Sequence, residues 1–194
     1  ISSGSSALRS RLPSLLDKCV LLMRVGDEYR IQTEESAAWT DEFQNQRSLL
    51  ASQSHRIEAE RNDRIRGKFK ELANKLSVTQ GRSKVVRDIN LVFDSQLPAD
   101  HDNKIYVWVR DGWSIDENSV RAEALQAGNH SPTVFVFIPR RSADDLRHQL
   151  IDYKAASATL DIRGVPNTPE GMEARAAMET VQQRADGKIK DLMD

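Results

Sequence analysis

The sequence contains little of what marks secreted, membrane-bound or strongly charged proteins. Its single cysteine, Cys19, excludes an internal disulfide framework and fits a reducing compartment. The 28 lysine and arginine residues nearly balance the 29 aspartate and glutamate residues, so the net charge of −1 indicates neither nucleic acid nor a membrane as a partner. No apolar run approaches the roughly 18 residues of a membrane span, and we expect no secretory signal. These observations predict a cytoplasmic chain that has no membrane partner.

Two common kinds of catalytic or cofactor site are also missing from the sequence. The phosphate-loop pattern G-x-x-x-x-G-K-[ST] is absent, because Phe69 follows Gly67 and Lys68, and Asn62 stands where the first glycine belongs. The four histidines, at positions 55, 101, 130 and 148, lack the spacing of metal ligands. We therefore expect no nucleotide bound in the P-loop manner, and no cofactor, within this segment.

The strongest structural signal lies in three apolar runs at residues 85–93, 104–110 and 133–138. Near-continuous runs of this kind are typical of strands that are buried on both faces of a parallel sheet. A helix of about a dozen residues between the last two runs completes a βαβ unit. The predicted fold class is therefore α/β, with a small, mainly parallel sheet and flanking helices.

Local signals place the helix of this βαβ unit and its core. Ser114 and Glu117 fit a capping box at the start of the helix, and Gly128 fits its end. We expect Trp108 on the central strand to be buried, together with Val136 on the next strand and Leu146 on the helix that follows.

The rest of the chain divides into segments of different pattern. Residues 7–33 read as a helix and a β-hairpin that turns at Gly26 and Asp27, which is typical of the end of a winged-helix domain or of any small αββ element. A helical apolar stripe follows, with a break expected near Ser52–Ser54 or Asn62. Near the end, Thr168 and Pro169 fit the start of a last helix. The predicted segments are 1–6 (tag or flexible lead-in), 7–33, 34–80 (long helical region), 81–162 (α/β domain) and 163–194 (connector and C-terminal helix).

Basic residues recur along the long helical region. Arg61, Lys68 and Lys75 stand seven residues apart beside the apolar stripe. Such residues can be long side chains that cover a core edge, or they can line a groove for an acidic partner or for nucleic acid. Heptad spacing beside apolar residues favours an acidic partner helix, because ion pairs of this kind select partners in coiled coils.

Two further sets of charged residues stand at the predicted strand ends. Arg140 and Arg141 follow the last strand and could contact phosphate or simply form a solvated surface. Asp94 and Asp111 each follow a strand, at the end where open α/β sheets place their sites, and two such carboxylates can bind Mg²⁺. Asp111 with Gly112 also fits an ordinary turn, and the D-x-D pattern of many phosphatases is missing.

Several separated stretches resemble one protein family. They are residues 28–33 with Trp39 and Phe43, 107–113, 131–132 with 137–139, 155–156, and 164–175. In this order they resemble the large P-loop ATPase of bacteriophage-exclusion (BREX) defence systems, over about residues 8–194. The resemblance implies a longer parent protein that uses ATP and Mg²⁺ in a domain preceding this segment, beside a DNA methyltransferase and other components. It assigns no ATP-binding or catalytic residue to this segment.

Three functional hypotheses follow from the sequence. The first is a non-catalytic segment for assembly or coupling in a phage-defence ATPase, with other BREX components or a second copy bound through the long helix. The second is a DNA-contacting module that uses the hairpin turn and the line Arg61, Lys68 and Lys75. The third is an Mg²⁺-dependent phosphoesterase built on Asp94 and Asp111.

Overall fold

The structure is a computed structural model, and it describes residues 11–12, 16, 22–25, 28–31, 33–98 and 104–194. Cys19, the predicted turn at Gly26 and Asp27, His101, and the predicted lead-in 1–6 lie outside these residues. Of the predicted first helix, only residues 11–12 and 16 are described, and they are helical. The predicted hairpin is present as β1 (Leu22–Val25) paired antiparallel with β2 (Glu28–Ile31).

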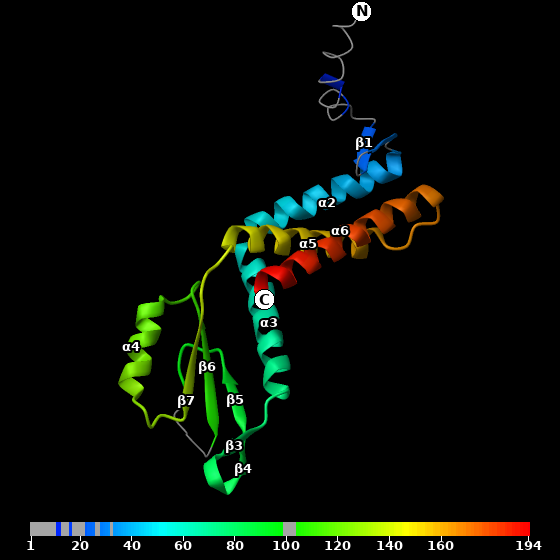
Figure 1. The fold of residues 1–194 in the computed structure, drawn as a ribbon. Helices are drawn as coiled ribbons and strands as arrows, with labels where there is room; N and C mark the ends of the chain where they lie inside the picture. The colour runs from blue at the N-terminus through cyan, green and yellow to red at the C-terminus, as the bar shows by residue number, and fades with distance from the viewer. Residues whose placement is uncertain (1–10, 13–15, 17–21, 26–27, 32, 99–103) are drawn as a thin grey trace, which may run out of the picture. The chain divides into compact units, whose positions relative to one another are not determined.

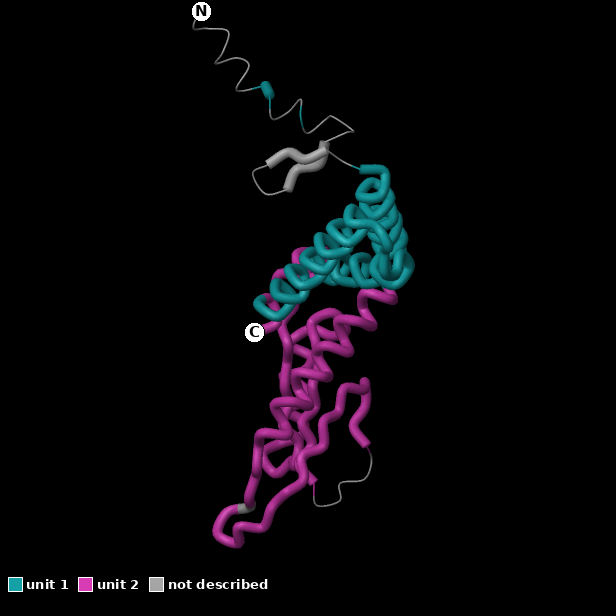
Figure 2. Tube along the Cα trace, turned by 90° about the vertical axis from the view of Figure 1, so that its right-hand side faces the viewer, with its two compact units in different colours: residues 1–54, 149–191 teal, residues 55–148, 192–194 magenta. Residues whose placement is uncertain are grey.

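The α/β fold class is confirmed (Figure 1). Contacts between residues divide the chain into two compact units, unit 1 with residues 1–54 and 149–191, and unit 2 with residues 55–148 and 192–194 (Figure 2). The predicted boundaries after residues 80 and 162 are not boundaries of these units. Both units combine segments that are distant in the sequence, which local patterns do not reveal.

Unit 1 is built on three helices, α2 (Glu34–Ser52), α5 (Ala143–Arg163) from residue 149 onward, and α6 (Pro169–Met193) up to residue 191. Its core surrounds Trp39, which packs with Ala156 and Leu160 of α5 and with two residues of α6, Ala174 and Met178. Small side chains on α5 and α6 let these helices approach the indole ring. The core of unit 1 therefore joins residues more than a hundred positions apart.

The helix starts of unit 1 agree with the sequence. Thr33 caps α2, since its Oγ1 accepts the N–H of Ser36 at 3.1 Å. Thr168 caps α6 in the same way through the N–H of Gly171 at 3.1 Å, and Pro169 is the first residue of that helix. The predicted start of the last helix at Thr168 and Pro169 is confirmed.

The predicted helical break is confirmed at the first of the two expected places. α2 ends at Ser52, where the N–H of Gln53 bonds to the carbonyl of Leu50 at 3.1 Å, and α3 (Ser54–Asn74) begins directly after it. The two helices belong to different units apart from Ser54. The predicted long arm is therefore two helices with different core partners.

The sheet of unit 2 consists of β5 (Ile89–Val92), β6 (Ile105–Asp111) and β7 (Thr133–Ile138), in the order β5-β6-β7. Both pairs are parallel, with Val92 beside Trp108 and Trp108 beside Phe135. One face carries Tyr106, Trp108 and Arg110, and α4 (Glu117–Ala127) covers it. The other face carries Val109 and Asp111 and lies under α3 (Figure 1).

The predicted strand at 85–93 is wrong as a single element. Its first part, β4 (Val85–Arg87), pairs antiparallel with β3 (Val78–Gln80), and only its second part, β5, joins the parallel sheet. The 3₁₀ turn η1 (Gly81–Ser83) links β3 and β4. The strand changes partner at Asp88, whose carbonyl accepts the N–H of Ile105 at 2.9 Å. A continuous apolar run does not show that its two ends pair with different strands.

Two local predictions in unit 2 need correction. α4 begins after Asp116, whose carboxylate accepts the N–H of Ser119 at 3.0 Å, so Asp116 is its N-cap in place of Ser114. Gly128 ends the helix with φ of 71°, as predicted. Trp108 and Leu146 are buried as predicted, but Val136 is only partly buried. Val136 is partly exposed because it lines a pocket beside β7, which is described below.

Within the described ranges, no helix combines the length and the apolar character needed to cross a membrane.

Candidate functional site: the carboxyl end of the parallel sheet

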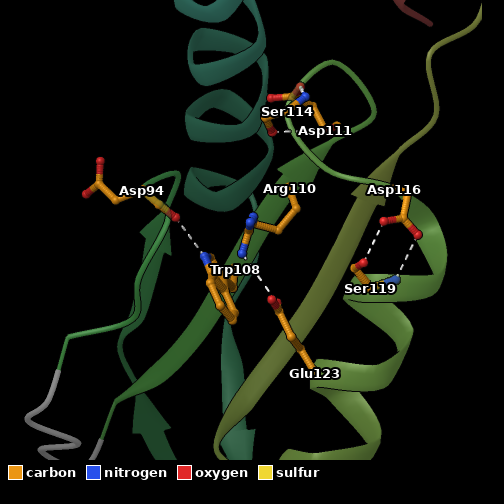
Figure 3. A network of polar contacts seen from close by, with 8 residues as sticks. All are labelled: Asp94, Trp108, Arg110, Asp111, Ser114, Asp116, Ser119 and Glu123. Atoms are coloured by element: carbon orange, nitrogen blue, oxygen red, sulfur yellow. Dashed lines mark hydrogen bonds and ion pairs between the residues drawn. The ribbon is translucent and has the colours of Figure 1, made fainter.

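The carboxyl ends of β6 and β7 are fixed to each other by a tight turn. One oxygen of the Asp111 carboxylate accepts the N–H groups of Trp113 and Ser114 at 3.0 and 3.1 Å. The Ser114 hydroxyl donates to the Asp111 carbonyl, and Figure 3 shows Asp111 and Ser114 side by side. The N–H of Gly112 bonds to the carbonyl of Ile138 at 2.9 Å. A Cβ on Gly112 would lie 2.9 Å from the backbone nitrogen of Arg140, so this position has room only for glycine. The turn thereby places Trp113 next to the segment that follows β7.

Asp94 and Asp111 do not converge on one point. Asp94 is exposed, and Figure 3 shows its carboxylate pointing away from Asp111. The backbone carbonyl of Asp94 accepts the indole N–H of Trp108 at 2.9 Å, so this residue helps to fix the core. Among the residues that the structure describes, no group of three histidine, cysteine, aspartate or glutamate side chains could hold a metal ion. The observed role of Asp111 is the structural turn that the sequence left open.

A second polar group lies on the face of the sheet under α4. Arg110 donates to Glu123 of α4 at 3.3 Å, and its guanidinium carbon lies 4.7 Å from the centre of the Trp108 ring. Figure 3 marks the Arg110–Glu123 contact by a dashed line and shows the Arg110 side chain beside Trp108. This group ties α4 to the sheet, and it lies on the face opposite α3.

Arg61 is the most enclosed of the predicted basic residues. Its guanidinium carbon lies 4.3 Å from the centre of the Trp113 ring, within the range of a cation–π contact. Burial lowers the pKa of Arg61, and nearby Arg140 lowers it further, while the carboxylates of Asp111 and Glu58 raise it. The cation–π contact thus places Arg61 against Trp113, as the sequence alone did not show.

Lys68 and Lys75 stand one heptad apart in the sequence, but their side chains pair with different carboxylates. The Lys68 ammonium pairs with the Asp194 carboxylate, and this hydrogen bond raises the pKa of Lys68. Lys75, one residue beyond α3, pairs instead with Glu71 at 2.6 Å, a local contact that lowers the pKa of Glu71. Of these two lysines, and within the part of the chain that the structure describes, only Lys68 pairs with a distant residue.

A pocket of about 460 Å³ lies in unit 2 between α3, β7 and the start of α5. Its walls are mostly apolar and include Phe69, Leu72, Trp113, Val136 and Leu146. Volumes of this order are typical of sites that bind a ligand or a few side chains of a partner. Val136 is only partly buried because it faces this open space.

Charged side chains complete the pocket. Lys68, Arg141 and Asp194 line it, and Arg140 is exposed next to Arg141. Of the five basic residues that the sequence singled out, Lys68 and Arg141 therefore line the pocket, and Arg61 stacks on its wall residue Trp113. Lys75 does not line it. The sequence missed the apolar wall, because its residues come from α3, the turn after β6, β7, α5 and the end of α6. The position of Trp113 shortly after β6 was a usable signal.

Comparisons with protein-family models, with curated proteins and with solved structures found no match to this chain.

Proposed function

We propose that the chain is a non-catalytic assembly or coupling segment of a bacterial phage-defence ATPase similar to that of BREX systems. The ATP and Mg²⁺ site belongs to a P-loop domain elsewhere in the parent protein, which acts in the cytoplasm. The partners are other components of the defence system or a second copy. The support for the parent's identity is the order and spacing of the sequence stretches that resemble this family.

The observation that carries a binding role is the pocket of unit 2. Its apolar walls adjoin Lys68 and Arg141, and Leu72 keeps nearly half of its surface (46%) open to solvent. Concave apolar surfaces rimmed by polar side chains mark sites of protein contact. The carboxylates that a phosphoesterase would need give less support, since Asp111 already binds two backbone N–H groups and Asp94 points away from it.

The test uses the parent protein in its own host. The reading frame that contains this segment should encode a phosphate loop upstream of it. Leu72→Asp, which puts a charge into the pocket, should abolish protection against phage in plaque assays. Leu125→Asp is the matched control, since Leu125 is an exposed leucine of α4 outside the pocket lining, and it should leave protection intact.

Two results would contradict this proposal. A reading frame without a phosphate loop would remove the ATPase parent. Full protection by the Leu72→Asp protein, at normal protein levels, would remove the pocket from the function. Purified residues 1–194 should not hydrolyse ATP, and turnover that Asp111→Asn abolishes would favour the phosphoesterase hypothesis.

A DNA-contacting role is the second candidate, and it is favoured by Arg140 and Arg141, which are both exposed directly after β7. A protein that makes 6–10 phosphate contacts loses about 10³–10⁵ in affinity for duplex DNA between 50 and 200 mM salt. Binding with that slope, weakened by charge reversal at Arg61 and Arg140, would establish DNA contact; we expect no such binding.

A further inference from the structure

One side of the pocket of unit 2 is formed by a short segment from the end of the chain. Leu192 and Met193, at the end of α6, form part of its lining, and the carboxylate of Asp194 pairs with the Lys68 ammonium. These three residues group with unit 2, whereas the rest of α6 groups with unit 1. The two apolar side chains of this segment thus match the apolar wall of the pocket, and its acidic side chain matches the basic rim.

The charges of the pocket are not balanced by this segment. Of the described residues that line the pocket, Asp194 is the only carboxylate, whereas both Lys68 and Arg141 are basic. No carboxylate in the described part of the chain pairs with the Arg141 guanidinium. Arg61 adds positive charge beside Trp113. A segment with a second carboxylate would therefore make one ion pair more than the end of α6 makes.

We propose that the pocket is the docking site for an acidic, apolar segment of a partner protein, and that Leu192–Met193–Asp194 covers one side of it until the partner displaces this segment. The inference rests on the partner-binding function proposed above and specifies the chemistry of that partner. Recognition would follow the helix-in-groove mode, in which apolar side chains fill a groove and charges at its rim set the orientation. The apolar walls distinguish this partner from nucleic acid, whose phosphates would leave Phe69 and Leu72 uncovered.

A covering segment within the same chain competes with any partner for this surface. Because it is tethered, its effective concentration is high, and the apparent affinity of a free segment equals its intrinsic affinity multiplied by the fraction of chains in which the pocket is uncovered. Removing the Lys68–Asp194 ion pair should therefore make the pocket easier to fill from outside. A device of this kind keeps the binding surface covered until a more acidic segment is present.

The test measures binding of a fluorescein-labelled peptide of residues 185–194, ADGKIKDLMD, to the full 194-residue chain by fluorescence anisotropy. The Asp194→Lys chain, in which the resident segment is repelled by Lys68 and Arg141, should bind the peptide on the order of tenfold more tightly than the unchanged chain. In the Asp194→Lys background, Lys68→Glu should reverse this gain. Lys75→Glu in that background is the matched control and should not, since Lys75 lies outside the pocket lining.

Binding that is equal in the unchanged and Asp194→Lys chains, or equal loss from Lys68→Glu and Lys75→Glu, would overturn the inference. So would binding of a 20-base-pair duplex that competes with the peptide and falls steeply with salt. Failure of peptide exchange while Leu72→Asp still abolishes phage protection would leave the proposed function standing. Peptide exchange in a protein whose reading frame lacks a phosphate loop would leave this inference standing and remove the proposed ATPase parent.

Discussion

Asp111 shows how a carboxylate at a strand end can bind the backbone of its own turn. One of its oxygens accepts two backbone N–H groups, which a loop leaving a strand would otherwise present to solvent. Asp116 performs the same task five residues later at the start of α4. At the scale of single residues, the acidic groups around this end of the sheet shape the backbone.

Substitution of Gly112 by alanine should destabilise the fold. In Gly112→Ala the new Cβ would meet the backbone nitrogen of Arg140, which cannot rotate away as a side chain could. We expect a lower midpoint in urea denaturation, together with a change in the fluorescence of Trp113. Gly67→Ala is the control, because nothing lies within 4 Å of its added Cβ and the helix gains propensity. Equal stability of the Gly112→Ala and unchanged chains would contradict the close approach.

Asp116 should make α4 sensitive to acid. Its hydrogen bonds with Ser119, first to the side chain and then to the backbone, lower the pKa of Asp116. A lowered pKa in the folded state stabilises the fold above the ordinary aspartate pKa of about 3.9, and this contribution is lost as the pH falls through the lowered value. Thermal melting should show that Asp116→Ala lowers the melting temperature at neutral pH and loses less on acidification than the unchanged chain does.

Asp116→Asn separates capping from charge at this position. Asparagine caps helices about as well as aspartate, so the neutral-pH melting temperature should stay close to that of the unchanged chain. Because the amide does not titrate, the acid-dependent loss should shrink as it does in Asp116→Ala. An identical acid dependence in all three proteins would show that the cap does not contribute to it.

At the scale of elements, the packing of unit 2 explains which residues of the apolar stripe of α3 are buried and which stay open. The apolar stripe of α3 places Ile57 and Ile65 in the core, and Phe69 meets Phe93 edge-on with ring centres 6.1 Å apart. Near the end of the helix the stripe is no longer fully covered, and Leu72 lines the pocket. The narrow stripe of the sequence is thus partly core and partly open surface on one continuous helix.

Trp108 should dominate the stability of the sheet. It is buried on the central strand, its ring centre lies 5.5 Å from that of Phe135, and its N–H bonds to the Asp94 carbonyl. Trp108→Ala should lower the free energy of unfolding by roughly 3–5 kcal/mol. Trp108→Phe keeps an aromatic ring and should cost less. A loss under about 1 kcal/mol for Trp108→Ala in denaturant melts would contradict its place in the core.

At the scale of the whole molecule, the chain enters each unit more than once. Unit 1 needs residues 149–191 to surround Trp39, whereas the three parallel strands of unit 2 and the helices α3 and α4 come from one continuous stretch. Helices α5 and α6 each contribute to both units. The two units therefore differ in how far they depend on distant sequence.

Two fragments should show this difference. Residues 55–148 contain every strand of the parallel sheet, so this fragment should unfold cooperatively in thermal melts followed by circular dichroism. Residues 1–54 contain Trp39 but none of its partners on α5 and α6, so they should show no cooperative transition. An unfolded 55–148 fragment beside a folded full chain would mean that unit 2 requires residues outside this stretch.

The sequence by itself determined the features that depend on near neighbours. The α/β class, the two parallel strands around α4, the break after Ser52 and the caps at Thr168 and Gly128 follow from β-branched runs, capping side chains and the backbone freedom of glycine. Each of these signals acts within a few residues of the feature that it specifies.

Only the tertiary structure decided which distant surfaces meet. It split the run 85–93 between two sheets, grouped α2 with α5 and α6, left Val136 facing a pocket, and paired Lys68 rather than Lys75 with Asp194. The physical reason is that burial is a property of pairs of surfaces. An apolar stripe in the sequence shows that one side of a helix can be buried. The packing of the remaining chain decides which part of that side is buried.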